Sequence, residues 1–92
     1  MQTTKQTQKN EVKANTPEKK FRAGTITATV WKNQADKNGK TFEYRTVSFE
    51  RSYTDEKGEW NTTNSLRLND LPKASLVLNK AYEYLAMNGV EE

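Results

Sequence analysis

A turn at residues 55–58 is the feature that most constrains the fold of this chain. Residues 41–53, before the turn, are rich in aromatic and β-branched side chains, which favour extended strands. The turn contains Asp and Gly, and residues 60–68 after it alternate as a second strand. A helical pattern follows from residue 71. The order strand, turn, strand and helix therefore predicts an α+β fold.

The chain is long enough for one domain, but only part of it can form a packed core. It has 92 residues, of which 33% are hydrophobic, and its mean hydropathy is −1.07. The first twenty residues hold five lysines, two glutamates and few aliphatic side chains. Such a segment buries too little apolar surface to offset the entropy of ordering it. We therefore expect residues 1–20 to be a disordered basic tail, residues 21–88 to be the folded domain, and residues 89–92 to be a flexible C-terminus.

The net charge of the chain is +3, from 15 basic and 12 acidic side chains. Residues 1–20, with five lysines and two glutamates, also carry +3, so residues 21–92 are formally neutral. An isoelectric point near 9.2 favours a polyanionic partner, but the tail supplies the excess charge. The sequence leaves open whether the tail is a non-specific nucleic-acid arm or a solubilising leader.

Cysteine and histidine are both absent from the sequence. Their absence excludes disulfide bonds, thiolate nucleophiles, the usual zinc ligands and the most common general acid or base near neutral pH. We therefore expect a protein that is not an enzyme and that uses no cofactor, metal ion or small-molecule substrate. Asp55, Glu56 and Glu59 are interpreted as turn residues rather than metal ligands, because Lys57 lies among them.

No apolar run approaches the roughly 20 residues that cross a bilayer, and the polar N-terminus lacks the apolar centre of a signal peptide. We expect an intracellular protein, in the cytoplasm and nucleoid or in the nucleus, with no membrane partner.

Residues 25–31 alternate as a half-buried antiparallel strand. Ile26, Ala28 and Val30 are predicted to line its core face, whereas Trp31 shares the other face with threonines. A large apolar side chain on a polar face suggests a binding partner, and the alternative is a tryptophan that folds over the strand edge. Gly24 predicts a bend or bulge in the extended segment that begins the fold.

A hairpin is predicted next, because Asn38 and Gly39 favour the positive φ of a tight turn. Residues 41–53 follow as a strand with no cleanly apolar face. We therefore expect a bulge or a strong bend that swaps the faces of this strand part-way.

The last predicted element is a helix that ends near Met87, with Asn69 or Asp70 as its N-cap and Pro72 near its first position. Its apolar residues cover an arc of roughly 160°, wider than the ~100° stripe that packs on one sheet. The extra width favours a homodimer in which helices or sheets pack across a two-fold axis. The alternative is a monomer whose helix sits deep.

Aromatic and basic residues interleave along the predicted strands, as a single-stranded nucleic-acid surface requires. The aromatic residues are Trp31, Tyr44, Tyr53 and Trp60, and the basic residues are Lys32, Lys40, Arg45, Arg51 and Arg67. Aromatic rings stack on bases at roughly 1–3 kcal/mol per base, and basic side chains neutralise the phosphates between them. The alternative is that these aromatics are ordinary sheet residues that shield a small core.

Residues 47–59, followed by Leu66-Arg67-Leu68-Asn69 and an amphipathic helix, resemble a known family. It is the single-stranded DNA-binding domain of transcriptional positive cofactor four, a relative of the Whirly proteins, and the resemblance covers about residues 21–87. It implies a curved four-stranded antiparallel sheet followed by one C-terminal helix (ββββα), dimerised largely through the helices, with single strands across the sheets. By the same resemblance, Tyr53 would stack on a base and Arg51, Lys37 and Lys40 would contact the strand.

The sequence thus predicts a homodimeric, sequence-tolerant single-stranded DNA-binding protein that acts as an accessory factor in transcription, replication or repair. Two alternatives stay open. One is a protein-interaction adaptor of the same fold that uses the surface around Trp31 and Tyr53. The other is an RNA-binding variant, since stacking and phosphate contacts do not read the 2′-hydroxyl.

Overall fold

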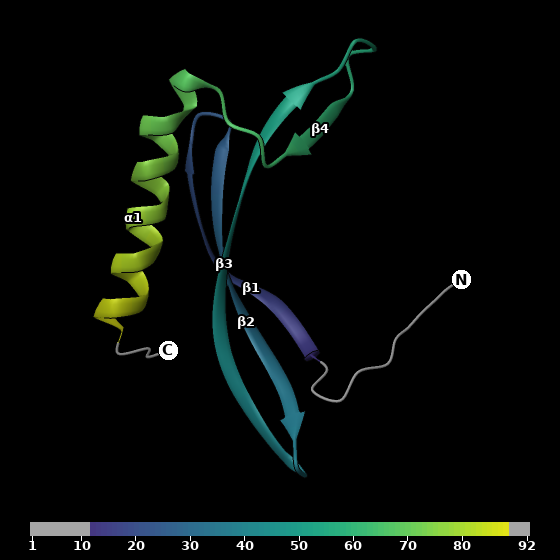
Figure 1. Ribbon diagram of the computed structural model, residues 1–92, viewed down its shortest axis with the longest axis vertical. Helices are drawn as coiled ribbons and strands as arrows, with labels where there is room; N and C mark the ends of the chain where they lie inside the picture. Colours follow the sequence, from purple (N-terminus) through teal and green to yellow (C-terminus); the bar gives the residue numbers. More distant parts are fainter. Residues whose placement is uncertain (1–11, 89–92) are drawn as a thin grey trace.

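The described part of the chain, residues 12–88 of a computed structural model, forms one antiparallel sheet followed by a C-terminal helix (Figure 1). The strands lie in the order β1-β2-β3-β4, so each strand pairs with its neighbour in sequence. The predicted ββββα order is confirmed. The elements are β1 Val12–Ala23, β2 Ile26–Lys37, β3 Lys40–Thr54, β4 Trp60–Thr63, the 3₁₀ turn η1 Leu68–Asp70 and the helix α1 Leu71–Met87.

Strand β1 begins at Val12, within the segment predicted to be a disordered tail. The prediction is wrong for residues 12–20, because this polar segment pairs with β2 from Val12 opposite Ala35 to Ala23 opposite Ile26. Main-chain hydrogen bonds to an existing strand order it without burial of large apolar side chains. Residues 1–11 and 89–92, the rest of the predicted tail and the predicted flexible C-terminus, lie outside the described residues.

The β2–β3 hairpin turns as predicted, with positive φ at Asn38 (55°) and Gly39 (80°). Its register is unbroken from Ile26 opposite Arg51 to Lys37 opposite Lys40, so the bulge expected in residues 41–53 is absent from β3 against β2. Register shifts lie in β1 instead, one of them between Pro17 and Lys19.

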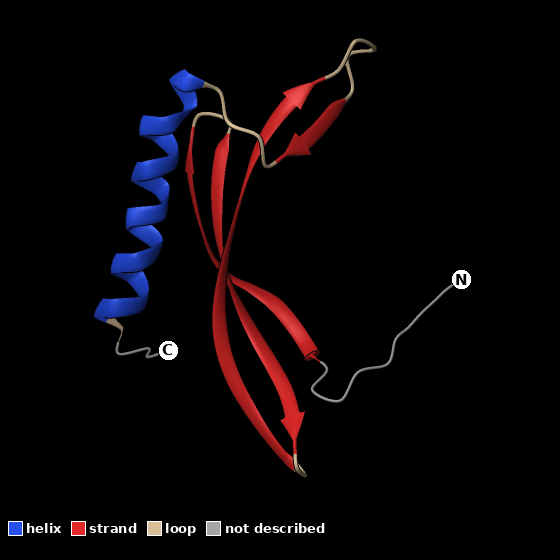
Figure 2. Ribbon diagram, viewed as in Figure 1, coloured by secondary structure: helices blue, strands red, loops and turns tan. Residues whose placement is uncertain are grey.

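The mixed faces of β3 have another cause, which is that α1 covers only one end of a long strand. Its contacts are mainly with β1 and β2, along one face of the sheet (Figure 2). Val47 and Phe49 lie on the face that carries the helix, because they pair with the core residues Val30 and Ala28. Phe42 and Tyr44 lie on the opposite face by the alternation of the strand.

Two predicted boundaries differ from the structure. Gly24, with φ of 62°, lies in the tight turn between β1 and β2 rather than inside an extended segment. The strand predicted over residues 60–68 ends at Thr63, where the Oγ of Thr63 accepts the N–H of Ser65 at 3.1 Å. This local bond turns the chain away from β3 and towards the helix.

The core lies between α1 and the helix-bearing face of the sheet. Its buried residues are Ile26, Ala28 and Val30 from β2, and Ala74, Val77 and Ala81 from α1. The core face predicted for residues 25–31 is therefore confirmed. Small residues on the helix allow it to approach the sheet closely, and Phe21 closes one side by an edge contact with Tyr84, 6.1 Å between ring centroids.

The helix begins and ends where the sequence predicts, from Leu71 to Met87 with Pro72 in its first turn. Asp70 takes the N-cap position without a side-chain cap bond. Its carboxylate instead accepts the backbone N–H of Arg67 at 2.7 Å and pairs with Arg51 at 3.3 Å. The buried Asp70 thus ties the start of α1 to strand β3.

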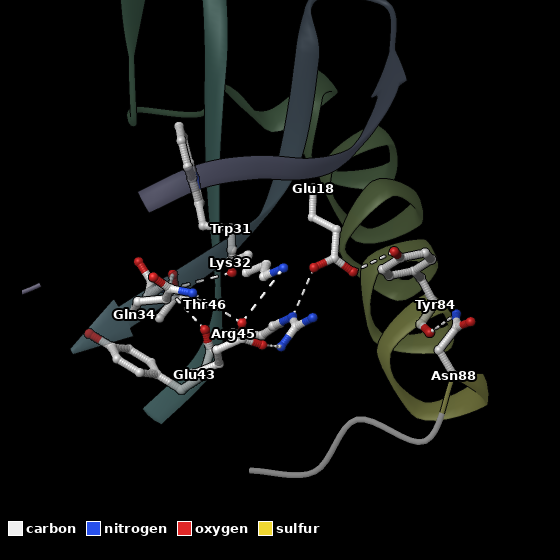
Figure 3. A network of polar contacts seen from close by, with 11 residues as sticks. Glu18, Trp31, Lys32, Gln34, Glu43, Arg45, Thr46, Tyr84 and Asn88 are labelled. Carbon is white, nitrogen blue, oxygen red and sulfur yellow. Dashed lines mark hydrogen bonds and ion pairs between the residues drawn. The ribbon is translucent and has the colours of Figure 1, made fainter. Parts of the chain in front are cut away.

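The C-terminal half of α1 is tied to β1 by a polar network around Glu18 (Figure 3). Tyr84 donates its hydroxyl to one carboxylate oxygen of Glu18 at 2.5 Å, and Arg45 pairs with the other at 2.8 Å. The bond from Tyr84, followed by that from Arg45, holds the pKa of Glu18 below its ordinary value. The same bond raises the pKa of Tyr84.

The Tyr84→Phe substitution tests this network through the pH dependence of stability. A carboxyl group with a lowered pKa stabilises the fold above its unfolded-state pKa, and that contribution disappears as the pH falls through the folded-state pKa. We therefore expect Tyr84→Phe to lower the melting temperature between about pH 6 and 8, with a smaller difference below the pKa of a free glutamate, about 4.3. Circular dichroism melts over a pH series measure the difference. A pH-independent difference would mean that the Glu18 charge does not stabilise the fold.

Candidate nucleic-acid interface

The sheet face opposite α1, called here the open face, gathers aromatic and basic side chains. Alternation and register assign residues to it, because directly paired residues point to the same face of an antiparallel sheet. Trp31 pairs with Thr46, and Ile26, Ala28 and Val30 point the other way, into the core. The aromatic and charged residues on the open face are Lys20, Arg22, Trp31, Lys37, Lys40, Phe42, Tyr44, Glu50 and Trp60.

The aromatic side chains of β2 and β3 form an aromatic surface on the open face. The Trp31 ring is half-buried and donates its Nε1–H to the Oγ of Ser48 at 2.9 Å. Figure 3 shows this ring pointing away from the Glu18 and Tyr84 network. Phe42 and Tyr44 lie 5.9 Å apart at a tilt of 32°, and Phe42 is 42% exposed. Rings held against a sheet with one side in solvent can receive bases by stacking.

A buried amide fixes the sheet between these rings. Asn33 is only 3% exposed, and its Nδ2 donates to the carbonyl oxygen of Tyr44 at 3.3 Å and to the Oγ1 of Thr46 at 3.1 Å. Its Oδ1 accepts from the Nδ2 of Asn15 at 3.2 Å. The amide thereby links β1, β2 and β3 between Trp31 and Tyr44, and we expect little rearrangement of the rings on binding.

The charge of the open face is strongly positive. Among the described side chains of β1, β2 and β3, it holds Lys20, Arg22, Lys37 and Lys40 against a single acid, Glu50. Within residues 12–88, Lys20, Lys37 and Lys40 form no ion pair, and Arg22 only donates to the carbonyl oxygen of Gly24 at 2.9 Å. Unpaired ammonium groups are available to phosphates.

The basic residues of β2 and β3 on the helix-bearing face are paired within the chain, whereas Lys19 of β1 only lies over the Phe21 ring, 5.8 Å from its centroid. Arg45 bonds to Glu18 at 2.8 Å and lies 3.6 Å from Glu43, which also lies 3.7 Å from Lys32 (Figure 3). Two bases and two acids leave no net charge in this group. Lys32 and Arg45 therefore serve the fold, and this region offers little attraction to a polyanion.

Arg51 and Arg67 hold the start of α1. Arg51, with a side chain 13% exposed, donates to the carbonyl oxygen of Ser65 at 3.0 Å and pairs with Asp70. Arg67 is mostly exposed and also reaches Asp70, at 3.3 Å. Tyr53 lies on the helix-bearing side, its ring 5.6 Å from the Arg51 guanidinium, and is 37% exposed. Arg51 is thus already occupied inside the fold.

The β3–β4 turn is organised by Asp55, as the turn interpretation predicts. Its Oδ1 accepts the N–H of Lys57 at 2.9 Å and that of Glu59 at 3.0 Å, and its Oδ2 accepts from Asn61 at 2.9 Å. These bonds, first the one from Glu59, lower the pKa of Asp55. No group of three acidic side chains in the described chain gathers closely enough to hold a metal ion.

The structure divides the nine predicted binding residues between two faces. Trp31, Lys37, Lys40 and Trp60 share the open face, with Trp60 68% exposed beyond the main sheet. Lys32, Arg45, Arg51 and Tyr53 lie on the helix-bearing face, and Arg67 follows β4 beside Asp70.

Sequence reasoning missed Lys20, Arg22 and Phe42 as binding candidates. The signal for the first two is the alternation of Lys20 and Arg22 with Phe21 and Ala23, which marks a strand with one basic face. The predicted tail ended at residue 20, so it concealed Lys20 but not Arg22.

Comparison with protein-family models, curated proteins and solved structures gave no match to this chain. The helix of the described region is neither long nor apolar enough to cross a membrane.

Proposed function

We propose that this protein binds single-stranded DNA on the open face of its sheet, with little preference for base sequence. The observation that carries the proposal is the combination on one face of the Trp31, Phe42 and Tyr44 rings with unpaired lysines. Stacking on rings accepts every base, and ammonium groups neutralise the phosphates without reading the sequence. The role we propose is that of an accessory factor in transcription, replication or repair.

Unpaired bases are the preferred ligand for this surface. In a duplex the base faces are stacked on one another, whereas a single strand can turn them towards Trp31 and Tyr44. RNA presents the same faces and phosphates, and it is the second ligand to test.

The proposal includes a homodimer. Helix α1 leaves Leu71, Leu78 and Tyr82 exposed by 49%, 38% and 70%, on the flank away from Tyr84. Val47 on the neighbouring β3 is 39% exposed on the same side of the sheet. A second copy is the partner we propose for this apolar surface, because a small domain builds only a limited core alone.

The test is a titration of the intrinsic tryptophan fluorescence with a ~20-nucleotide oligothymidine at several salt concentrations. Binding should change the fluorescence, weaken in salt and exceed that of the matching duplex. For a single strand, the logarithm of the binding constant falls with the logarithm of the salt concentration by about 0.7 per phosphate neutralised. The four basic side chains of the open face therefore predict a slope of about −3. The same titration with oligouridine compares RNA with DNA. Absence of any binding in low salt would overturn the proposal and favour the protein-interaction adaptor.

A further inference from the structure

Among the residues that the structure describes, none pairs with the outer edge of β3 over most of the length of this strand. Strand β4 covers only Arg51 to Thr54, and β2 occupies the other side of β3 throughout. No other strand of residues 12–88 pairs with β3 before Arg51. An exposed edge presents a row of free N–H and C=O groups that can pair with another strand.

The backbone bonds at the end of β3 identify the groups that point outward. The carbonyl oxygen of Phe49 accepts from Asn64, and the N–H of Asp55 reaches Glu59, both on the β4 side. The N–H of Ser52 points the other way, to the carbonyl oxygen of Thr25 on the β2 side. Because direction alternates along a strand, odd-numbered residues point outward. The free outward groups are those of Thr41, Glu43, Arg45 and Val47.

These four residues are centred on Tyr44, and their charges complement one another about that centre. An antiparallel pairing of two copies about Tyr44 sets Thr41 opposite Val47 of the partner subunit. It also sets Glu43 opposite Arg45 of the partner subunit, twice over by symmetry. A pairing centred on Arg45 would instead set two like charges opposite each other, which destabilises a sheet.

We propose that two copies of this chain join through the free edges of β3, in antiparallel register centred on Tyr44, to form one continuous sheet of both subunits. The pairing supplies about eight main-chain hydrogen bonds, since each outward-facing pair forms two. It specifies the interface of the homodimer proposed above and therefore rests on that part of the proposed function.

The helix flank supports this arrangement. The flank of α1 that carries Tyr84 faces β1, as the contact with Phe21 shows. Leu78 and Tyr82 lie on the opposite flank by the 100° helical rotation, so they face the β3 side. An axis perpendicular to the sheet keeps both helices on one face. The exposed flanks of the two α1 helices and the two Val47 side chains then face the same axis. Tyr82, which is 70% exposed in a single copy, lies on this flank.

Joining the edges also extends the open face. Tyr44 lies on that face and would meet Tyr44 of the partner subunit at the centre of the joined sheet. The aromatic rings and lysines of both copies would then form one continuous surface, long enough for a single DNA strand that crosses the two-fold axis.

Single-cysteine variants of the full chain test the register, because the natural sequence contains no cysteine. Residues opposite each other without mutual hydrogen bonds have Cα atoms about 4.5 Å apart, within the range for a disulfide. Tyr44→Cys should therefore form a covalent dimer under mild oxidation. Thr46→Cys is the matched control on the same face, because its two copies would lie roughly 14 Å apart and should cross-link at least about ten times more slowly. Mixing Thr46→Cys with Phe42→Cys should restore cross-linking, since these positions face each other.

Sedimentation of the unmodified protein without DNA separates the possible outcomes. Dimers that cross-link at Tyr44→Cys and in the mixed pair support the proposal. Dimers that cross-link faster through Thr46→Cys, or only through Tyr82→Cys, would overturn the register or the edge pairing. A monomer at every concentration would overturn the dimer itself. A monomer that still binds oligothymidine would leave the nucleic-acid proposal standing, so the two failures are distinguishable.

Discussion

The Trp31→Ala variant is expected to bind oligothymidine about 5- to 150-fold more weakly than the natural protein, the loss of one base stack worth roughly 1–3 kcal/mol. The ring lies on the open face and, within residues 12–88, forms only one hydrogen bond, from its Nε1–H to the Oγ of Ser48. Ser48 is exposed, so water replaces that bond in the variant. Fluorescence anisotropy of a labelled oligonucleotide measures the affinity, because it does not depend on the tryptophan removed.

Tyr53→Ala is the matched control, an aromatic residue on the other face of the same sheet. Tyr53 is 37% exposed and lies beside Arg51 on the helix-bearing side. We expect its loss to change the affinity by less than about twofold, since only screened, long-range charge effects reach the open face from there. The resemblance to the transcriptional positive cofactor four family implies the opposite, because by that resemblance Tyr53 stacks on a base and its loss should weaken binding more. A larger loss from Tyr53→Ala than from Trp31→Ala would therefore move the binding surface to the helix-bearing face.

Ile26→Ala is expected to lower the free energy of unfolding by about 2–5 kcal/mol, the usual cost of a large-to-small change in a packed core. Ile26 is fully buried, at 0% exposure, where β2 meets α1. A domain of this size has a small total stability, so the loss is a large fraction of it. Urea denaturation followed by far-ultraviolet circular dichroism gives the difference.

Leu76→Ala is the control for that measurement, because Leu76 is an aliphatic residue of α1 with 52% exposure. Its change should stay within about 0.5 kcal/mol, as for most surface substitutions. Equal losses from the two variants would mean that the helix does not pack on β2 as described.

Elements with strong local signals were predicted well. Pro72 and the residues around Asp70 mark the start of the helix, and Asn38 with Gly39 marks the hairpin, because each acts through its own backbone. Strand β1 was not predicted from Val12, since its order comes from pairing with β2 rather than from its composition. A polar edge strand and a polar tail look alike in sequence.

In the candidate site too, features set by neighbouring residues were predicted and features set by residues distant in the sequence were not. Alternation predicted that Trp31 lies opposite the core face of its strand, which the structure confirms. It could not predict that Arg45 and Arg51 are occupied, because Glu18 and Asp70, their partners, come from distant parts of the chain. Basic side chains that form ion pairs cannot be told from those that do not until the β-strands are placed side by side.

Because α1 covers only part of the sheet, the backbone hydrogen bonds of the sheet differ in how readily they open. The end near Ile26 and Ala28 is backed by the helix, and its amide hydrogens can exchange only when the core opens. The turn at Asn38 and Gly39 extends beyond the helix, so its backbone bonds open more readily. A nucleic-acid strand lying along the open face would therefore meet a rigid surface over most of the sheet and a more mobile one only at the turn beside Lys37 and Lys40.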